Sequence, residues 1–219
     1  KTSVLMALLG EMPTVKGHRR QHPNLTFPLA SQQPWILNMT VRENICFTST
    51  PFDKDAYEKT LKRCQLQSDL TRLAQGDRTM IGERGANLSG GQKTRISMAR
   101  AVYHYLHHQA RTDGDGCVLM MDDPLASVDA KVAGMLADMI VEDLHSATRI
   151  IVTEHPAIVK RADCVYMVRD GFVCRVDADE SDIFTPSSSI HQHTEHEEAQ
   201  VEAQLEPITE DKSPFKDGR

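Results

Sequence analysis

An apolar run in the middle of the chain ends in two acidic residues. The run from Val118 to Asp122 reads Val-Leu-Met-Met-Asp, and Asp123 follows it directly. This pattern is typical of a buried parallel strand with polar residues at its carboxyl end. Such a strand places the Asp122 carboxylate at the sheet edge, where it can hold hydrated Mg²⁺ beside nucleotide phosphates. Taken alone, the pattern also fits any buried strand that meets an acidic turn.

The first three residues, Lys1, Thr2 and Ser3, are of the types that form the other, phosphate-binding half of such a nucleotide site. In a phosphate-binding loop the lysine reaches the β- and γ-phosphates, and the hydroxyl after it binds Mg²⁺. The tripeptide alone also fits the plain start of a helix, but the two halves together predict a nucleotide site. The glycine-rich turn that should come before Lys1 is not in the sequence, so we interpret the chain as a piece that begins inside this motif.

A stronger signal is the segment Leu88-Ser89-Gly90-Gly91-Gln92. Its two glycines let backbone N–H groups approach a phosphate, Ser89 adds a hydroxyl donor, and a helix is expected just beyond. These features predict an anion site at a helix N-terminus. A flexible Ser-Gly loop is the alternative, but the run that begins at Ile81 and continues into Arg95 and Arg100 disfavours it.

The composition fits a soluble globular chain of 219 residues with a formal net charge of -6, so a nucleic-acid surface is not expected. No apolar run is long enough for a membrane-spanning helix. Five scattered cysteines without a C-x-x-C pair fit a reducing compartment and argue against a disulfide framework or a zinc site.

The elements that must position these residues alternate between strands and helices, which predicts an α/β fold with an all-helical insertion over about 36–100. The stretch 103–117 is polar and rich in turn residues, and we expect a surface loop there. Strands are expected at 25–30, 118–121 and 149–153, with a hairpin at 164–168 and 172–176. Helices are expected at 1–12, 56–64, from 68 onward, at 92–106, 130–144 and 157–161.

After Phe184 the chain becomes acidic and loses its large apolar residues, which predicts a disordered linker over 185–219. His191, His193 and His196 form H-x-H-x-x-H. Solvated linker histidines explain this spacing better than a metal site does.

These motifs, in this order, resemble the first nucleotide-binding domain of a subfamily C ABC transporter, the multidrug-resistance-associated protein group. The likeness runs from Lys1 to about Phe184, so it implies a P-loop NTPase (ABC ATPase) domain over 1–184, truncated at its N-terminus. Gln32 resembles the Q-loop residue, which touches Mg²⁺ and the attacking water. The segment 40–45 resembles the part that meets the membrane domain, and 126–129 resembles the D-loop.

The resemblance implies that two cassettes pair head to tail around ATP and Mg²⁺. Lys1, Thr2, Ser3, Gln32 and Asp122 would belong to one composite site, with Thr2, Gln32 and, through water, Asp122 at the metal. The residues that would complete the opposite site, on a second cassette, are those of the signature: Ser89, Gly90, Gly91 and Gln92.

Two departures from the family weaken the first site. Competent ATPases of this family carry Glu where this chain has Asp123, whose carboxylate is one methylene shorter and stops short of the water. The family's switch histidine falls on Glu154 when one counts back from Asp163, and a carboxylate there would repel the γ-phosphate. A local shift that brings in His155 is the alternative.

Three functions remain open at this point. The first is a cassette of an ATP-driven exporter, at the cytoplasmic face of a membrane and joined to it through segments outside this sequence. The second is a regulatory ATP-binding module of a channel-type subfamily C member. The third, a soluble ABC protein of DNA repair or translation, is disfavoured by the segment 40–45 and by the acidic balance.

Overall fold

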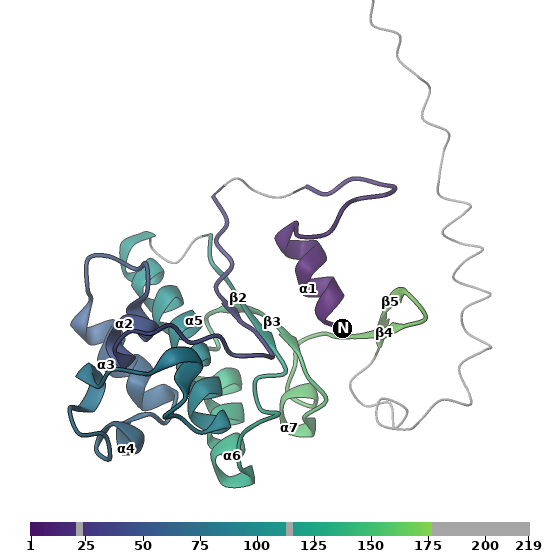
Figure 1. Cartoon of the computed structure of the whole chain (residues 1–219). Coiled ribbons are helices and arrows are strands. Elements are labelled where there is room, and N and C mark those ends of the chain that lie inside the picture. The colour runs from purple at the N-terminus through teal and green to yellow at the C-terminus, as the bar shows by residue number, and fades with distance from the viewer. Residues whose placement is uncertain (21–23, 113–115, 177–219) are drawn as a thin grey trace, which may run out of the picture. The chain divides into compact units, whose positions relative to one another are not determined.

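The computed structural model describes residues 1–20, 24–112 and 116–176 (Figure 1). The chain divides into two units, 1–179 and 180–219. The expected linker, its boundary at 184 and the three spaced histidines lie outside the described residues. In the part that is described, no helix is both long and apolar enough to cross a bilayer.

Three parallel strands form the main sheet. They lie in the order β1 (Leu29–Ala30), β2 (Val118–Asp122) and β3 (Thr148–Val152), with Ala30 opposite Met121 and Asp122 opposite Val152. β2 lies in the middle, and its apolar run is almost fully buried, as expected for a strand covered on both faces. The parallel sheet confirms the predicted α/β class.

Helix α1 (Thr2–Leu9) begins at the second residue and contacts β2. Its one fully buried side chain is Leu5. Gly10 ends the helix with a φ of 86°, a left-handed conformation that glycine adopts without a steric penalty. The helix expected over 1–12 is therefore present but ends at Leu9, before Gly10.

A helical part follows β1 and contains α2 (Val41–Cys46), α3 (Lys54–Arg63) and α4 (Gln67–Leu70) (Figure 1). Thr40 and Glu43 form a capping box at the start of α2, and Asp53 accepts a hydrogen bond from the Ala56 N–H at the start of α3. The predicted helix from residue 68 is wrong in length, because α4 ends at Leu70 and turns follow it.

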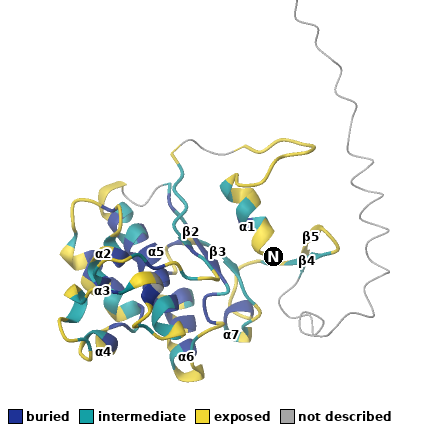
Figure 2. Ribbon diagram, viewed as in Figure 1, coloured by how far each residue is buried: buried dark blue, intermediate teal, exposed yellow. Residues whose placement is uncertain are grey.

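Helix α5 (Gly90–Thr112) joins the helical part to the sheet, because it contacts α2 and α3 as well as β1 and β2. Much of this helix is buried (Figure 2). The predicted surface loop over 103–117 is therefore wrong for most of its length. The helix continues because its next glycine is Gly114, and because Tyr103, Tyr105 and His107 are buried.

The last described elements follow β2. Helix α6 (Ala130–Asp138) continues into a π-helical turn at Met139–Asp143, so the predicted helix over 130–144 has an irregular last third. Asp129 caps α6 by accepting from the Val132 N–H. β3, the short α7 (Pro156–Val159) and the antiparallel hairpin of β4 (Val165–Arg169) and β5 (Phe172–Val176) come next.

Candidate nucleotide-binding site

The predicted halves of the phosphate site meet in the structure. The Thr2 hydroxyl donates a hydrogen bond of 2.7 Å to Oδ2 of Asp122. Thr2 opens α1, whereas Asp122 ends β2 and is 3% exposed. Ser3 is exposed in the first turn of α1. Packing of α1 against the sheet thus brings together a hydroxyl and a carboxylate that are remote in sequence.

Lys1 and Glu154 form an ion pair at the same edge of the sheet. Glu154 follows β3, and both side chains are largely exposed. The hydrogen bond from Lys1, with the attraction of its ammonium group, lowers the pKa of the Glu154 carboxyl. Glu154, which counting back from Asp163 places in the position of the switch histidine, therefore contacts Lys1, the residue expected to bind phosphate.

His155, the alternative switch residue, takes a different place. Its backbone N–H donates a hydrogen bond of 3.0 Å to the Thr153 hydroxyl oxygen, and the residue occupies the N-cap position of α7. Its ring Nδ1 is buried without a hydrogen-bond partner. Glu154, rather than His155, is thus the residue that contacts Lys1.

Asp123 leaves β2 in a conformation unusual for a residue with a side chain. Its φ is 45°, and its N–H donates to the Val152 carbonyl oxygen at 2.7 Å. This bond joins the ends of β2 and β3 just beyond their last pair. The half-buried Asp123 therefore has its backbone fixed by the neighbouring strand.

Gln32 lies two residues beyond β1 and is exposed. Because β1 and β2 are parallel, with Ala30 opposite Met121, the chain after β1 leaves the sheet at the edge where Asp122 lies. The preceding Ser31 hydroxyl donates to the Gln33 carbonyl oxygen at 2.9 Å. The topology thus places the predicted Q-loop at the edge that carries the phosphate-site residues.

The signature segment forms the N-terminal cap of α5. The Ser89 N–H donates to the Gln92 side-chain oxygen at 2.9 Å, and the Gln92 N–H donates to the Ser89 hydroxyl oxygen at 3.2 Å. This reciprocal pair is a capping box. An added Cβ at Gly90 would meet nothing within 4 Å, so the first turn of α5 is open to a ligand on that side.

Gly91 has a different neighbour. A Cβ there would lie 3.2 Å from the backbone oxygen of Ser127, in the predicted D-loop. From the sequence, Gly90 and Gly91 were both expected to let backbone N–H groups approach a phosphate. The structure separates them, because Gly91 also lets the D-loop pass close to α5.

An aromatic cluster was missed from the sequence. The Arg100 guanidinium lies 3.4 Å from the centre of the Trp35 ring, and its Nε donates to the Asn44 carbonyl oxygen at 2.7 Å. Burial lowers the pKa of Arg100 to about 10. The Trp35 and Phe47 rings meet edge to face at 5.1 Å, and both side chains remain partly exposed. No sequence pattern linked Trp35 to Arg100, because the two residues are 65 positions apart and meet only through packing.

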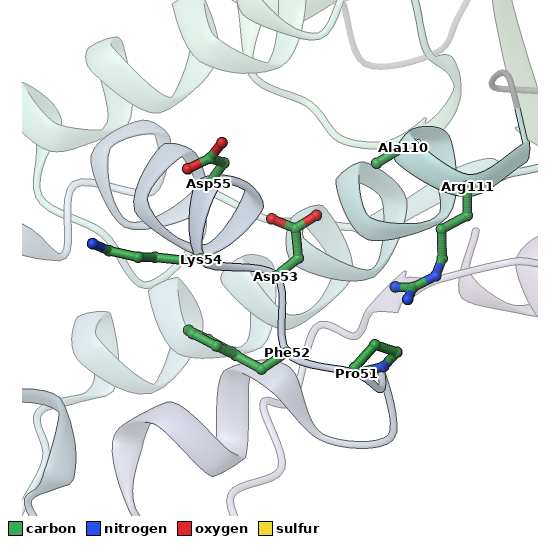
Figure 3. Close-up of a pocket in the computed structure, with 7 residues that line it drawn as sticks. All are labelled: Pro51, Phe52, Asp53, Lys54, Asp55, Ala110 and Arg111. Carbon is green, nitrogen blue, oxygen red and sulfur yellow. The ribbon is translucent and has the colours of Figure 1, made fainter.

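A pocket of about 460 Å³ lies elsewhere, between the loop into α3 and the C-terminal end of α5 (Figure 3). Asp53 and Arg111 face it from these two elements. None of the predicted site residues lines this pocket. The pocket is therefore separate from the predicted nucleotide site.

The donor set at the sheet edge fits a magnesium ion. Mg²⁺ prefers oxygen ligands, and the Thr2 hydroxyl and the buried Asp122 carboxylate supply two oxygens 2.7 Å apart. When bound, such an ion would help to neutralise the negative charge of the phosphates. Lys1, which is expected to bind the phosphates, precedes α1 and is paired with Glu154 in this structure.

Sequence comparisons agree with this geometry. The family model described as "ABC transporter" matches residues 1–107. ATP-binding cassette sub-family C member 4 of Mus musculus is 41% identical over 172 residues, which cover 78% of this chain and 12% of that protein. Metal resistance protein YCF1 of Saccharomyces cerevisiae is 41% identical over 174 residues, with 78% and 11% covered. ATP-binding cassette sub-family C member 10 of Homo sapiens is 40% identical over 177 residues, with 80% and 11% covered.

The fold and site define a P-loop ATPase domain with a helical signature part. The chain belongs to the ABC transporter family, and the relatives it resembles are subfamily C members. It spans about 12% or less of the length of these relatives. The predicted family and fold class are confirmed.

Proposed function

We propose that this chain is a cassette that binds MgATP at a head-to-tail interface with a second cassette and couples ATP to export across a membrane. The observation that carries the proposal is the 2.7 Å contact between Thr2 and Asp122, which assembles the metal-binding half of the site. The second support is the capped signature segment at the start of α5, on a separate element.

In its own composite site the chain would hold ATP through Lys1, Thr2 and Ser3, with Gln32 beside the metal and the water. Lys1 must leave Glu154 to reach the phosphates, because pairing the single Lys1 ammonium with both anions would weaken its contact with each of them. Once Lys1 has moved, the Glu154 carboxylate is left near the γ-phosphate, and like charges repel. This arrangement disfavours rapid turnover at this site.

Asp123 adds to the same effect. A general base must lie within hydrogen-bond reach of the water that it activates. The Asp123 backbone is fixed by its bond to Val152, so the shorter side chain cannot approach by a simple backbone shift. A catalytic group misplaced by about 1 Å can cost on the order of 100-fold in rate. We therefore propose that this site holds ATP and hydrolyses it slowly.

The opposite site would be completed by Ser89, Gly90, Gly91 and Gln92. The start of α5 offers backbone N–H groups and the positive end of the helix dipole to a phosphate. The lysine, the metal ligands and the catalytic glutamate of that site would come from the second cassette. Because the signature is complete, we propose that the opposite site hydrolyses ATP.

The route to the membrane runs through the surface near Trp35 and Phe47. A pocket of about 160 Å³ lies beside these exposed rings, next to the predicted contact segment 40–45. An exposed aromatic pair beside a pocket is suited to receive a partner's side chain. Two relatives, one from Saccharomyces cerevisiae and one from Caenorhabditis elegans, are named as metal resistance and multidrug resistance proteins, which favours export. The second candidate is a regulatory ATP-binding module of a channel-type subfamily C member. The proposed slow hydrolysis at the Lys1 site favours this function as much as it favours export.

Nucleotide trapping in the whole transporter tests the asymmetry. With labelled ATP, the site that contains Lys1 should retain the triphosphate, while the opposite site should accumulate diphosphate. The Asp122→Asn variant should abolish retention at the first site, whereas Asp163→Asn, on the surface after α7, should leave it unchanged. Rapid conversion of ATP at the Lys1 site would contradict the proposal.

A further inference from the structure

The side chain of Gln92 has an orientation that its neighbours determine. Its oxygen accepts from the Ser89 N–H at 2.9 Å, and its Nε2 donates to Oδ1 of Asp69 at 3.0 Å. An ionised carboxylate only accepts hydrogen bonds. The amide nitrogen must therefore face Asp69, and the amide oxygen must face Ser89.

Asp69 is itself held firmly. Its Oδ2 accepts from the Arg95 guanidinium at 2.7 Å, and the two side chains are only 12% and 10% exposed. Asp69 belongs to α4, whereas Gln92 and Arg95 lie one turn apart on α5. The carboxylate therefore fixes α4 to the first turns of α5, and each oxygen has a separate donor.

We infer that Asp69 is a positioning residue for the signature segment, acting through Gln92 on Ser89. The Ser89 hydroxyl oxygen already accepts from the Gln92 N–H at 3.2 Å, so its own proton remains free to donate. Asp69 thus orients a donor toward a phosphate of the ATP held by the second cassette. This inference rests on the proposed role of the signature in the opposite site.

The first experiment replaces Asp69 by Asn in the whole transporter. An amide at this position has one acceptor oxygen instead of two, so it cannot serve both Gln92 and Arg95. We expect KM for ATP hydrolysis at the opposite site to rise roughly tenfold, the size of one lost charged hydrogen bond, with kcat changed less. Asp55→Asn, at an exposed position on α3, is the matched control and should leave KM unchanged.

A second variant separates positioning from folding. Gln92→Met removes the link to Ser89 and keeps the Asp69–Arg95 pair, and thermal unfolding of the isolated chain checks that each variant folds. A double variant combines Asp69→Asn with Gln92→Met. If Asp69 acts through Gln92, this double variant should raise KM no more than Gln92→Met alone. Additive effects of the two substitutions would overturn the inference.

Gly90→Asp separates this inference from the proposed function, because it places a carboxylate at the open start of α5. If Gly90→Asp stops turnover while Asp69→Asn leaves KM unchanged, the inference is wrong and the proposed function stands. If neither variant changes turnover or KM for ATP at the opposite site, the proposed function is wrong as well. In the isolated chain, Asp69→Asn should speed hydrogen exchange of the Ser89 N–H, and unchanged exchange would also overturn the inference.

Discussion

At the scale of single residues, the site depends on a few paired charges. Glu154 contacts Lys1, and that ammonium group lowers the pKa of the Glu154 carboxyl. The pair is therefore fully formed above the ordinary pKa of a glutamate and is lost as the pH falls through the lowered value. Both groups are exposed, so the pair matters for the position of Lys1 rather than for stability.

The thiols give a prediction at this scale. Burial raises the pKa of Cys64 to about 12 and that of Cys46 to about 11, whereas Cys164 and Cys174 are exposed. Only the thiolate reacts with an alkylating agent, and a raised pKa leaves less thiolate at pH 8. Iodoacetamide should modify Cys164 and Cys174 first and Cys64 last, as measured by mass spectrometry of peptides. Equal rates in the folded chain would contradict the burial of Cys64.

At the scale of elements, α5 connects the parts of the molecule. Its first turn carries the signature, and its middle carries Arg100 against the Trp35 ring. The Tyr103 phenolic oxygen accepts a hydrogen bond of 2.9 Å from the Asp53 N–H at the start of α3. The two signature glycines sit at the start of α5 in different surroundings. Their difference arises from the neighbouring D-loop and not from the helix itself.

Substitution of the two glycines by alanine tests this difference. Gly90→Ala meets open space, so its higher helix propensity should make it neutral or stabilising by up to about 1 kcal/mol. Gly91→Ala places a methyl group 3.2 Å from the Ser127 oxygen, so the D-loop backbone must shift. We expect Gly91→Ala to be less stable than Gly90→Ala by about 1 kcal/mol in urea unfolding. Equal free energies of unfolding would show that the D-loop moves freely.

At the scale of the whole molecule, the chain would contribute different residues to two proposed ATP sites, and these contributions differ in quality. In the proposed own site, Asp123 and Glu154 lie where the resemblance implies Glu and His. In the proposed signature, Gln92 donates to Asp69, which also pairs with Arg95. These features favour a cassette that holds one nucleotide and promotes hydrolysis of another. The partly exposed rings of Trp35 and Phe47 form the surface that we propose as the contact with a membrane domain.

Restoring the family residues tests the weak site. Asp123→Glu combined with Glu154→His should raise phosphate release from the Lys1 site of the whole transporter, by up to roughly 100-fold if position alone limits it. The longer carboxylate reaches the water, and the imidazole donates to the phosphate instead of repelling it. Asp55→Glu combined with Glu58→His, on the exposed face of α3, is the control pair. Unchanged turnover would mean that another step limits this site.

Local chemistry in the sequence was enough to predict the α/β class, β2 and the hairpin, whereas the roles of the residues in both half-sites stay predictions. An apolar run that ends in Asp122, a Ser-Gly-Gly-Gln segment and a glycine at the end of a helix each have a local physical cause. The length of α5 was predicted wrongly, because the burial of Tyr103, Tyr105 and His107 comes from tertiary packing that their local sequence does not show.

What tertiary structure alone decided is which of these residues meet. The contact of Thr2 with Asp122 requires α1 to pack on β2, and the contact of Lys1 with Glu154 requires β3 beside β2. Asp69 carries no local signal, since its role depends on α4 lying against the first turns of α5. Side-chain periodicity specifies elements one at a time, whereas a site is formed by backbone packing between elements remote in sequence.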